Sequence, residues 1–180
     1  GKKTIMCYAR DAAMLASSYG SADHRAFLQL KEAVNDILLG GDTIRMTCKL
    51  GTDISGSISK SDRETPGDVS VRRFPLGVPQ PLDASEMSGR VALTHFLTPT
   101  GSKMYEPASV PIDDIVFAEV QDGVITGFDG EPENVENIQG HYKMVSQKFG
   151  IRDDNVHSFH AGIHPGCNYT STAAADPDRW

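Results

Sequence analysis

The chain has 180 residues and a mass of 19.5 kDa, a size that can bury its own hydrophobic core in one globular region. Its 17 basic and 24 acidic residues give a formal charge of −7, so its long-range field repels nucleic acid and anionic lipid. No apolar run reaches the roughly 20 residues that a membrane-spanning helix needs. Absent a removed leader, we expect a cytoplasmic protein that binds neither nucleic acid nor membrane.

The three cysteines are scattered along the chain at Cys7, Cys48 and Cys167. They form neither an even set nor a C-x-x-C pair, which argues against a disulfide framework and against a thiolate zinc site. We expect them to be reduced residues that serve in packing.

Two segments have the periodicity of amphipathic helices. The first follows Asp23, a candidate N-cap, and stops at Gly40-Gly41; the second starts at Pro132 and stops at Gly150. The apolar positions are Phe27, Leu30, Val34, Ile37 and Leu38 in the first segment and Val135, Ile138, Tyr142, Val145 and Phe149 in the second. These are the two main helices that the sequence predicts.

Period-two alternation predicts the strands. Residues 44–50 alternate, and residues 53–59 suit an antiparallel partner. Residues 89–97 form a further candidate strand, and residues 114–120 and 124–128 flank a turn as a hairpin. The candidate strand at 89–97 places Val91, Leu93, His95 and Leu97 on one face.

Two other segments have weaker signals. Residues 4–9 are apolar and suit an interior strand, whereas residues 59–88 contain four prolines and suggest an irregular surface segment that lines a cleft. The resulting fold class is α+β, with a largely antiparallel sheet and two main helices.

Three histidines lie close together near the C-terminal end, at His157, His160 and His164. Neutral imidazole is a common ligand of divalent transition metals, and on an extended segment His160 and His164 fall on the same face. This spacing permits one shared ion. Gly162 and Pro165 disfavour a helical H-x-x-x-H arrangement, and a loop of exposed or hydrogen-bonded histidines is the alternative.

Two other features could act on a substrate. His95, on the apolar face of its predicted strand, is either a core or edge histidine or a general acid or base. Arg72 and Arg73 lie beside the proline-rich segment, where they either clamp a substrate carboxylate or form a solvated face.

Four segments, in this order, resemble the thermophilic aminopeptidase superfamily: residues 43–53, 73–77, 113–128 and 159–163. The similarity spans most of the chain. It implies that residues 1–180 are the middle and C-terminal region of a longer aminopeptidase-like α/β protein, truncated at both ends. It also implies that the remainder of the polypeptide is a partner of this region, and that the protein is a homo-oligomer.

The resemblance implies a particular kind of metal site. The aminopeptidases hold two metal ions largely through carboxylates, one of them in a Gly-Glu step after the proline matched by Pro75. Here Val78 follows Gly77, and His160 stands where another family carboxylate falls. Both departures favour a single-metal site, as in two divergent branches that act on aromatic compounds. These branches are the 2,5-dihydroxypyridine dioxygenases, which use ferrous iron, and the 5-nitroanthranilate aminohydrolases, which use a divalent metal to replace an aromatic amine with hydroxyl.

The residues before Pro75 distinguish the two branches. His160 matches the first histidine ligand of the dioxygenases, whose further His and Asp ligands would follow Trp180. The dioxygenases also carry a substrate-binding histidine just before the matched proline, whereas this chain has Arg72, Arg73 and Phe74 there. Because a cation at this place suits a carboxylate, the resemblance favours an aminohydrolase that acts on a small aromatic acid.

The resemblance therefore predicts a hydrolase that uses one divalent transition metal, with manganese or iron preferred over zinc or cobalt. His160 would bind the metal together with ligands outside this chain, and Arg72 and Arg73 would bind the substrate carboxylate. His95 or His164 would relay a proton to the departing ammonia. Ring-opening dioxygenation, peptide hydrolysis and a non-catalytic structural or binding role are the alternatives.

Overall fold

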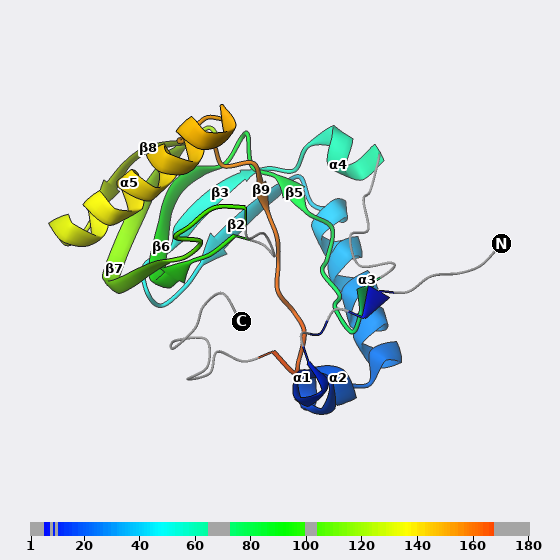
Figure 1. The fold of residues 1–180 in the computed structure, drawn as a ribbon. Helices are drawn as coiled ribbons and strands as arrows, with labels where there is room; N and C mark the ends of the chain where they lie inside the picture. Colours follow the sequence, from blue (N-terminus) through cyan, green and yellow to red (C-terminus); the bar gives the residue numbers. More distant parts are fainter. Residues whose placement is uncertain (1–5, 8, 10, 65–72, 100–103, 168–180) are drawn as a thin grey trace. The chain divides into compact units, whose positions relative to one another are not determined.

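The computed structural model describes residues 6–7, 9, 11–64, 73–99 and 104–167 (Figure 1). The chain divides into two compact units. Unit 1 comprises Gly1–Ile44, Ser57–Asp83 and Ser158–Tyr169, and unit 2 comprises Arg45–Gly56, Ala84–His157 and Thr170–Trp180.

Helices and a mostly antiparallel sheet make up the described residues, which confirms the α+β class. The helices are α1 (Ala12–Ala16), α2 (Ser18–Ser21), α3 (His24–Gly40), α4 (Lys60–Glu64) and α5 (Pro132–Phe149). The strands are β1 (Met6–Cys7), β2 (Thr43–Thr47), β3 (Asp53–Ser57), β4 (Arg73–Phe74), β5 (Leu82–Asp83), β6 (Ser88–Leu97), β7 (Val110–Gln121), β8 (Val124–Asp129) and β9 (Ser158–Phe159). No helix in these ranges is long and apolar enough to cross a membrane.

The largest sheet has five strands in the order β2-β3-β6-β7-β8. Strand β6 pairs antiparallel with both β3 and β7, and β7 pairs antiparallel with β8. The predicted hairpin is confirmed as β7 and β8, whose two-residue turn Asp122-Gly123 has positive φ at both positions, as a type I′ turn requires. Two small two-stranded sheets, β1-β4 and β5-β9, complete the pairing.

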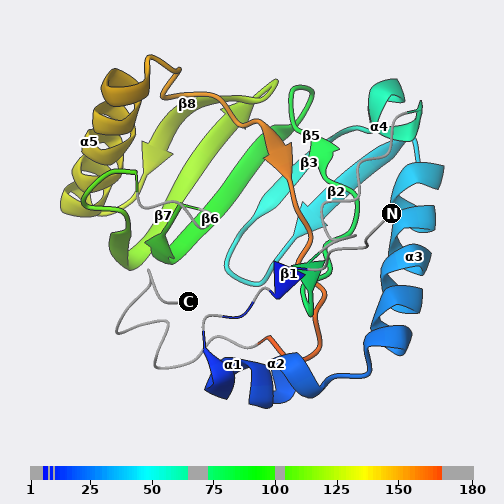
Figure 2. The same ribbon diagram turned by 45° about the vertical axis from the view of Figure 1, so that its right-hand side comes forward.

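Helix α5 covers one face of this sheet, alongside β7 and β8 (Figures 1 and 2). Its predicted limits are confirmed: Pro132 starts the helix, and Gly150 closes it with an N–H that donates to Ser146 O at 2.8 Å. The core beneath α5 consists of Val110, Ile112, Val116 and Ile138, with Leu93, Leu97, Phe128, Val135 and Tyr142 packed around them. Apolar burial against β7 therefore supplies the stability that helix propensity alone does not.

Gly140→Ala is expected to stabilise the protein by about 0.5–1 kcal/mol, because alanine loses less conformational entropy than glycine in a helix interior. A Cβ at Gly140, on α5, would meet no other atom within 4 Å. Urea unfolding followed by circular dichroism measures the gain. A lower unfolding midpoint than that of the wild type would contradict this prediction.

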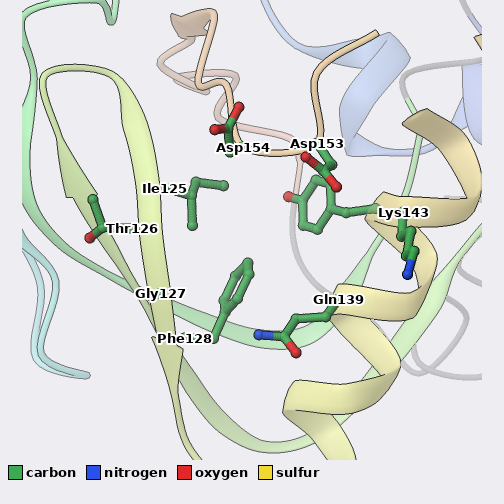
Figure 3. Close-up of a pocket in the computed structure, with 9 residues that line it drawn as sticks. Ile125, Thr126, Gly127, Phe128, Gln139, Lys143, Asp153 and Asp154 are labelled. Atoms are coloured by element: carbon green, nitrogen blue, oxygen red, sulfur yellow. The ribbon is translucent and has the colours of Figure 1, made fainter. Parts of the chain in front are cut away.

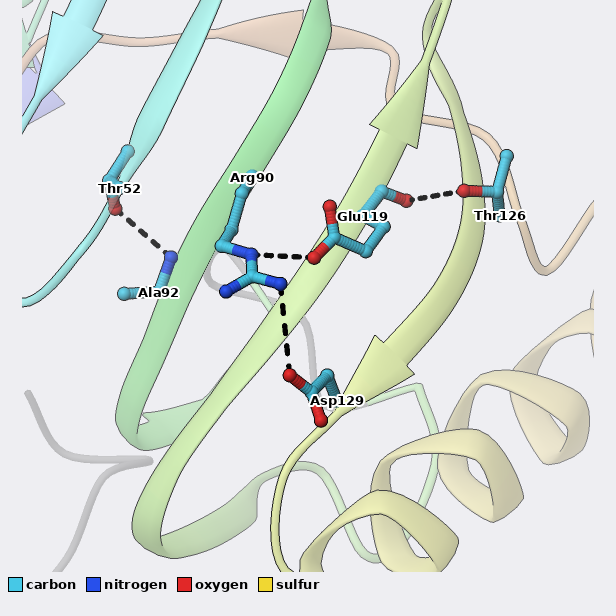
Figure 4. A network of polar contacts seen from close by, with 6 residues as sticks. All are labelled: Thr52, Arg90, Ala92, Glu119, Thr126 and Asp129. Carbon is cyan, nitrogen blue, oxygen red and sulfur yellow. Dashed lines mark hydrogen bonds and ion pairs between the residues drawn. The ribbon is translucent and has the colours of Figure 1, made fainter.

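The opposite face of the sheet carries a polar network (Figure 4). The Arg90 guanidinium donates to Glu119 at 2.6 Å, lies 3.7 Å from the Asp129 carboxylate and stacks 4.7 Å from the centre of the Phe117 ring. Arg90 thus links β6 to β7 and β8. These charged side chains are between 38% and 69% exposed, so the ion pairs add little to stability. The network connects the side chains of three neighbouring strands.

Helix α3 begins and ends as the sequence predicts, and the Asp23 carboxylate accepts from the Arg25 and Ala26 N–H groups as the N-cap. The predicted buried face is wrong in part. Phe27 is buried, but Leu30 is 47% and Ile37 75% exposed. Only part of the apolar side of α3 is therefore used in the core of unit 1.

The predicted face of strand β6 is wrong at His95. The β6–β7 register shifts between Leu93 and His95, and His95 has a φ of 69° with an exposed side chain. Leu93 and Leu97 still pack against the core. A local break in the ladder removes His95 from the apolar face because period-two alternation holds only while the strand is regular.

The prediction of an irregular surface segment at residues 59–88, of which the structure describes 59–64 and 73–88, is wrong in part. Residues 59–88 include α4, β4 and β5, and Leu82, Ala84 and Met87 are among the most deeply buried side chains. Of the interior strand predicted at residues 4–9, the described Met6 and Cys7 form β1, but both are exposed, so these two residues are not interior.

The prediction that the three cysteines are packing residues is also wrong. Cys7, Cys48 and Cys167 are free thiols, as expected, but all three are exposed.

Candidate functional site

The histidine-containing segment of residues 157–167 is anchored at both ends, and its residues from Ser158 onward belong to unit 1. At its start, β9 pairs antiparallel with β5, with Phe159 opposite Leu82. At its end, Ser18 Oγ donates to Gly166 O at 3.1 Å, and a Cβ on Gly166 would overlap the Ser18–Tyr19 backbone. The chain between these anchors is irregular in conformation but fixed in place.

His160 lies between the two anchors with an exposed side chain. Its Nε2 is 2.9 Å from Ser158 Oγ, which leaves Nδ1 as the other imidazole nitrogen. A histidine that ligates a metal through one nitrogen usually has a hydrogen-bond partner on the other, which orients the ring. The Ser158 hydroxyl can provide that partner.

His164 is packed between two rings. Its centroid lies 4.7 Å from that of Tyr19 and 4.7 Å from that of Phe27, and its Nδ1 accepts from the Gly166 N–H at 3.1 Å. Burial, with a smaller contribution from nearby His24, lowers the pKa of His164 below its usual value. The ring is therefore held neutral, with its remaining proton on Nε2.

Lowering the pH through about 6.5, the pKa of an unfolded histidine, is expected to destabilise unit 1. Because the folded-state pKa of His164 is lowered, the unfolded chain binds more protons in this window, and stability falls as the pH drops toward the folded pKa. Urea unfolding at about pH 7.5 and about pH 5.5 measures the slope.

His164→Asn keeps an acceptor for the Gly166 N–H but cannot titrate, so we expect a shallower pH dependence. His141, whose pKa is also lowered by burial, contributes in the same direction and preserves part of the slope. A slope in His164→Asn equal to that of the wild type would refute the role of His164.

A cluster of rings, which we call the histidine–aromatic cluster, surrounds the first turns of α3. It consists of Tyr19, His24, Phe27, Phe74 and His164. His24 lies 4.9 Å from Phe74, edge to face, and 6.4 Å from Phe27. A Cβ on Gly77 would overlap the Phe27 ring, so the backbone of residues 73–77 passes directly against this cluster.

The histidine–aromatic cluster joins residues 73–77, which carry part of the sequence resemblance, to His164, which directly follows the resembling residues 159–163. Residues 73–77 contribute Phe74 and the close approach of Gly77, and the anchored segment after β9 contributes His164. These segments are far apart in sequence but meet on the same two side chains of α3, His24 and Phe27. Sequence reasoning missed His24, since no spacing relates it to the other histidines; its Nδ1 is buried without a hydrogen-bond partner among the described residues.

The other predicted site residues are not members of the histidine–aromatic cluster. Arg73 belongs to β4, where its backbone pairs with Met6 of β1, and Arg72 lies outside the described residues. His95 belongs to unit 2 rather than to unit 1 with His160 and His164.

The predicted metal site has one ligand, His160, among the residues that the structure describes. Among the residues that the structure describes, no group of three His, Cys, Asp or Glu side chains could hold a metal ion. A single imidazole does not form a site, since zinc sites take about four ligands and iron sites of this class take a facial triad. His160 fits the donor type, and further ligands would have to come from outside the described residues.

Unit 2 contains a cavity of about 290 Å³ between β8 and α5 (Figure 3). The side chains of Ile125, Phe128 and Gln139 extend toward the same space. Tyr142 lines it as well, and its ring is stacked with Phe128 at 6.1 Å. Burial raises the pKa of Tyr142, so its hydroxyl stays protonated at neutral pH.

The rim of this cavity is polar. Lys143 and Asp153 lie on it, and Asp154 is held there by two hydrogen bonds from Arg152 at 2.7 and 2.9 Å. None of the site residues predicted from the sequence lines this cavity. Its lining residues come from β8, from α5 and from Asp153 and Asp154 after the helix, and no local pattern signals that they meet.

Comparisons of the chain with protein-family models, with curated proteins and with solved structures found no match.

Proposed function

We propose that this chain forms part of a divalent-metal-dependent hydrolase that replaces the amine of a small aromatic acid with a water-derived hydroxyl. The observation that supports the proposal is the meeting of residues 73–77 and the anchored histidine segment at His24 and Phe27. Residues 73–77 and 159–163 were singled out by resemblance to metalloenzymes that act on aromatic rings. The predicted substrate-binding Arg73 immediately precedes Phe74, and the predicted metal ligand His160 lies four residues before His164.

His160 would bind the metal through Nδ1, since Nε2 is engaged with Ser158 Oγ at 2.9 Å. When bound, a divalent ion lowers the pKa of water enough to supply hydroxide at neutral pH. The Ser158 hydroxyl would accept a hydrogen bond from the Nε2–H group and so orient the ring. Ligands beyond the described residues would complete the site.

The remaining residues would bind the substrate and supply a proton to the leaving amine. Arg73 would pair with the substrate carboxylate and orient the ring. A carbon–oxygen bond forms at the amine-bearing ring carbon, the carbon–nitrogen bond breaks, and the proton lost by water leaves on ammonia. His164, neutral and protonated on Nε2, can donate a hydrogen bond to that nitrogen. His95 is the alternative proton relay.

The test uses the complete gene product, loaded in turn with ferrous and manganous ions and incubated with aminobenzoates in heavy-oxygen water. We expect an aromatic product that has exchanged its amine for a labelled hydroxyl, detected by mass spectrometry. His160→Ala should lose bound metal and activity together. His157→Ala, a change of another exposed histidine three residues away, should retain both.

Two results would overturn the proposal. A product that gains two unlabelled oxygens from air would identify a ring-opening dioxygenase. Full metal content and activity in His160→Ala would remove the predicted ligand. Cleavage of leucyl dipeptides, run in parallel, would instead identify a peptidase.

Ser158→Ala is expected to weaken metal binding about tenfold or more, because loss of a hydrogen-bond partner to a metal-ligating histidine has an effect of this size. Equilibrium metal titration measures the change. Ser59→Ala, which removes contacts to the Ser61 hydroxyl at 2.8 Å and from the Asp62 N–H at 3.0 Å, is the matched control and should bind metal normally. Unchanged affinity in Ser158→Ala would contradict the assignment of Nδ1 as the ligating atom.

A non-catalytic binding role is the second candidate, and the cavity in unit 2 favours it. Its apolar floor of Ile125 and Phe128 with the Lys143 ammonium on the rim suits a small aromatic acid. Phe128→Ala would remove part of this apolar floor. If aminobenzoate binding is lost in Phe128→Ala and no metal binds to the wild type, the binding role replaces the hydrolase.

A further inference from the structure

The cavity of unit 2 differs in chemical character between its two sides (Figure 3). Ile125 and Phe128 of β8 form an apolar side. Across from them lie Asp153 and Lys143, which carry opposite charges. With a volume of about 290 Å³, the cavity is at the lower end of the range for small-molecule sites and accommodates a single ring with a short substituent.

Both charged residues have defined places on the rim. The segment that follows α5 is bound to the edge of β8, where the Ile125 N–H donates to Asp154 O at 2.7 Å. This hydrogen bond fixes the backbone directly after Asp153. Lys143 lies on α5 four residues after Gln139, which also lines the cavity, and residues at this spacing share one face of a helix.

Lys143 and Asp153 are the charges of this rim that have no ion-pair partner. Asp154 accepts two hydrogen bonds from Arg152, and the pKa of Arg152 is raised mainly by Asp154 and least by Asp153. Among the residues that the structure describes, neither Lys143 nor Asp153 forms an ion pair, either with the other or with a third residue. A ligand with one positive and one negative group would pair with both.

We infer that the cavity of unit 2 binds a free aromatic α-amino acid. Such a ligand has its ammonium and its carboxylate on one carbon, so the two groups can lie together beside Asp153 and Lys143. The ammonium would pair with Asp153 and the carboxylate with Lys143. The side chain would extend across the cavity and pack on Phe128, since aromatic rings pair favourably with one another.

The charge on the amine distinguishes this ligand from an aminobenzoate. An aromatic amine is conjugated with its ring and is uncharged at neutral pH, so it cannot pair with Asp153 as a cation. The ammonium of an α-amino acid is charged at neutral pH. Tyr142 does not oppose the carboxylate, because burial raises the pKa of its hydroxyl and keeps it uncharged. The cavity is therefore suited to a zwitterion.

Isothermal titration calorimetry of the 180-residue chain with L-phenylalanine at neutral pH tests the inference. We expect saturable binding of a single phenylalanine by each chain. 3-Phenylpropanoate lacks the ammonium and phenethylamine lacks the carboxylate, and each should bind about two- to fivefold more weakly, as expected for the loss of an exposed ion pair. L-Alanine has both charged groups but no ring, and it should show no binding.

Substitutions assign each charge of the ligand to its partner. Lys143→Met should weaken the binding of phenylalanine and 3-phenylpropanoate about two- to fivefold and leave phenethylamine, which has no carboxylate, unchanged. Asp153→Asn should weaken phenylalanine and phenethylamine and leave 3-phenylpropanoate unchanged. The matched controls are Lys148→Met and Asp114→Asn, which alter exposed charges that do not line the cavity and should have no effect.

Absence of phenylalanine binding at up to about 10 mM would overturn the inference. Equal affinities for phenylalanine, phenethylamine and 3-phenylpropanoate would overturn it as well. Tighter binding of 2-aminobenzoate than of phenylalanine would instead assign the cavity to an aromatic acid. All lining residues belong to unit 2, whereas His160 and Arg73 belong to unit 1, so these outcomes are independent of the proposed hydrolase and its metal.

Discussion

Gly89→Ala is expected to lower the free energy of unfolding by about 3 kcal/mol or more. Gly89 lies in β6, paired with Ile54 of β3 on one side and Val120 of β7 on the other. Its φ of +139° is a backbone conformation that other residues rarely adopt. An added Cβ would overlap the Asp53 carbonyl oxygen and lie 2.7 Å from the Ile54 Cα.

These neighbours are backbone atoms of a paired strand, so they cannot move aside without loss of the β3–β6 ladder. Urea unfolding followed by circular dichroism measures the loss. Gly127→Ala, in β8, is the matched control: its Cβ would meet nothing within 4 Å, and its unfolding midpoint should stay close to that of the wild type. Equal midpoints for Gly89→Ala and Gly127→Ala would show that β6 can relax around the new side chain.

Ile138→Ala is expected to cost about 2–5 kcal/mol, the usual range for truncation of a fully buried isoleucine. Ile138 is 0% exposed and packs with Val110, Ile112 and Val116 beneath α5. The change removes apolar contact and leaves a cavity between α5 and β7. The same urea experiment measures the loss.

Ile151→Ala serves as the control for Ile138→Ala. Ile151 is 56% exposed, so the same truncation removes little buried surface and should change the free energy of unfolding by about 0.5 kcal/mol or less. A loss in Ile138→Ala no larger than in Ile151→Ala would mean that α5 is not fastened by this core.

The two longest helices were predictable because their signals are local. Asp23 caps α3 through hydrogen bonds to the next two or three residues, and Pro132 and Gly150 bound α5. The β7–β8 hairpin follows from Asp122-Gly123 in the same way. Capping and turn formation involve groups within a few residues of one another, so a single sequence contains all the information.

The choice of buried face was not predictable in the same way. Helix α3 has more apolar positions than its core uses, and periodicity does not say which of them, Phe27 or Ile37, is covered. His95 fails for a related reason: the register shift that exposes it depends on pairing with β7, some 17 residues further along.

The candidate site combines both kinds of information. The sequence singled out residues 73–77 and the histidines at 160 and 164, partly through resemblance. It did not show that Phe74 and His164 meet around His24 and Phe27. The metal, the reaction and the substrate stay predictions, and the labelled-water experiment decides among them.

By itself, then, the sequence determined the α+β class, the limits of α3 and α5 and the β7–β8 hairpin, since hydrogen bonds between near neighbours and local apolar periodicity specify them. Only the tertiary structure decided that Ile37 is exposed, that Leu82 and Met87 are buried, and that two distant segments meet at the histidine–aromatic cluster. Those outcomes depend on which surfaces pack across large separations in the chain. Long-range burial selects among locally equivalent faces, and a residue pattern does not encode that selection in any short window.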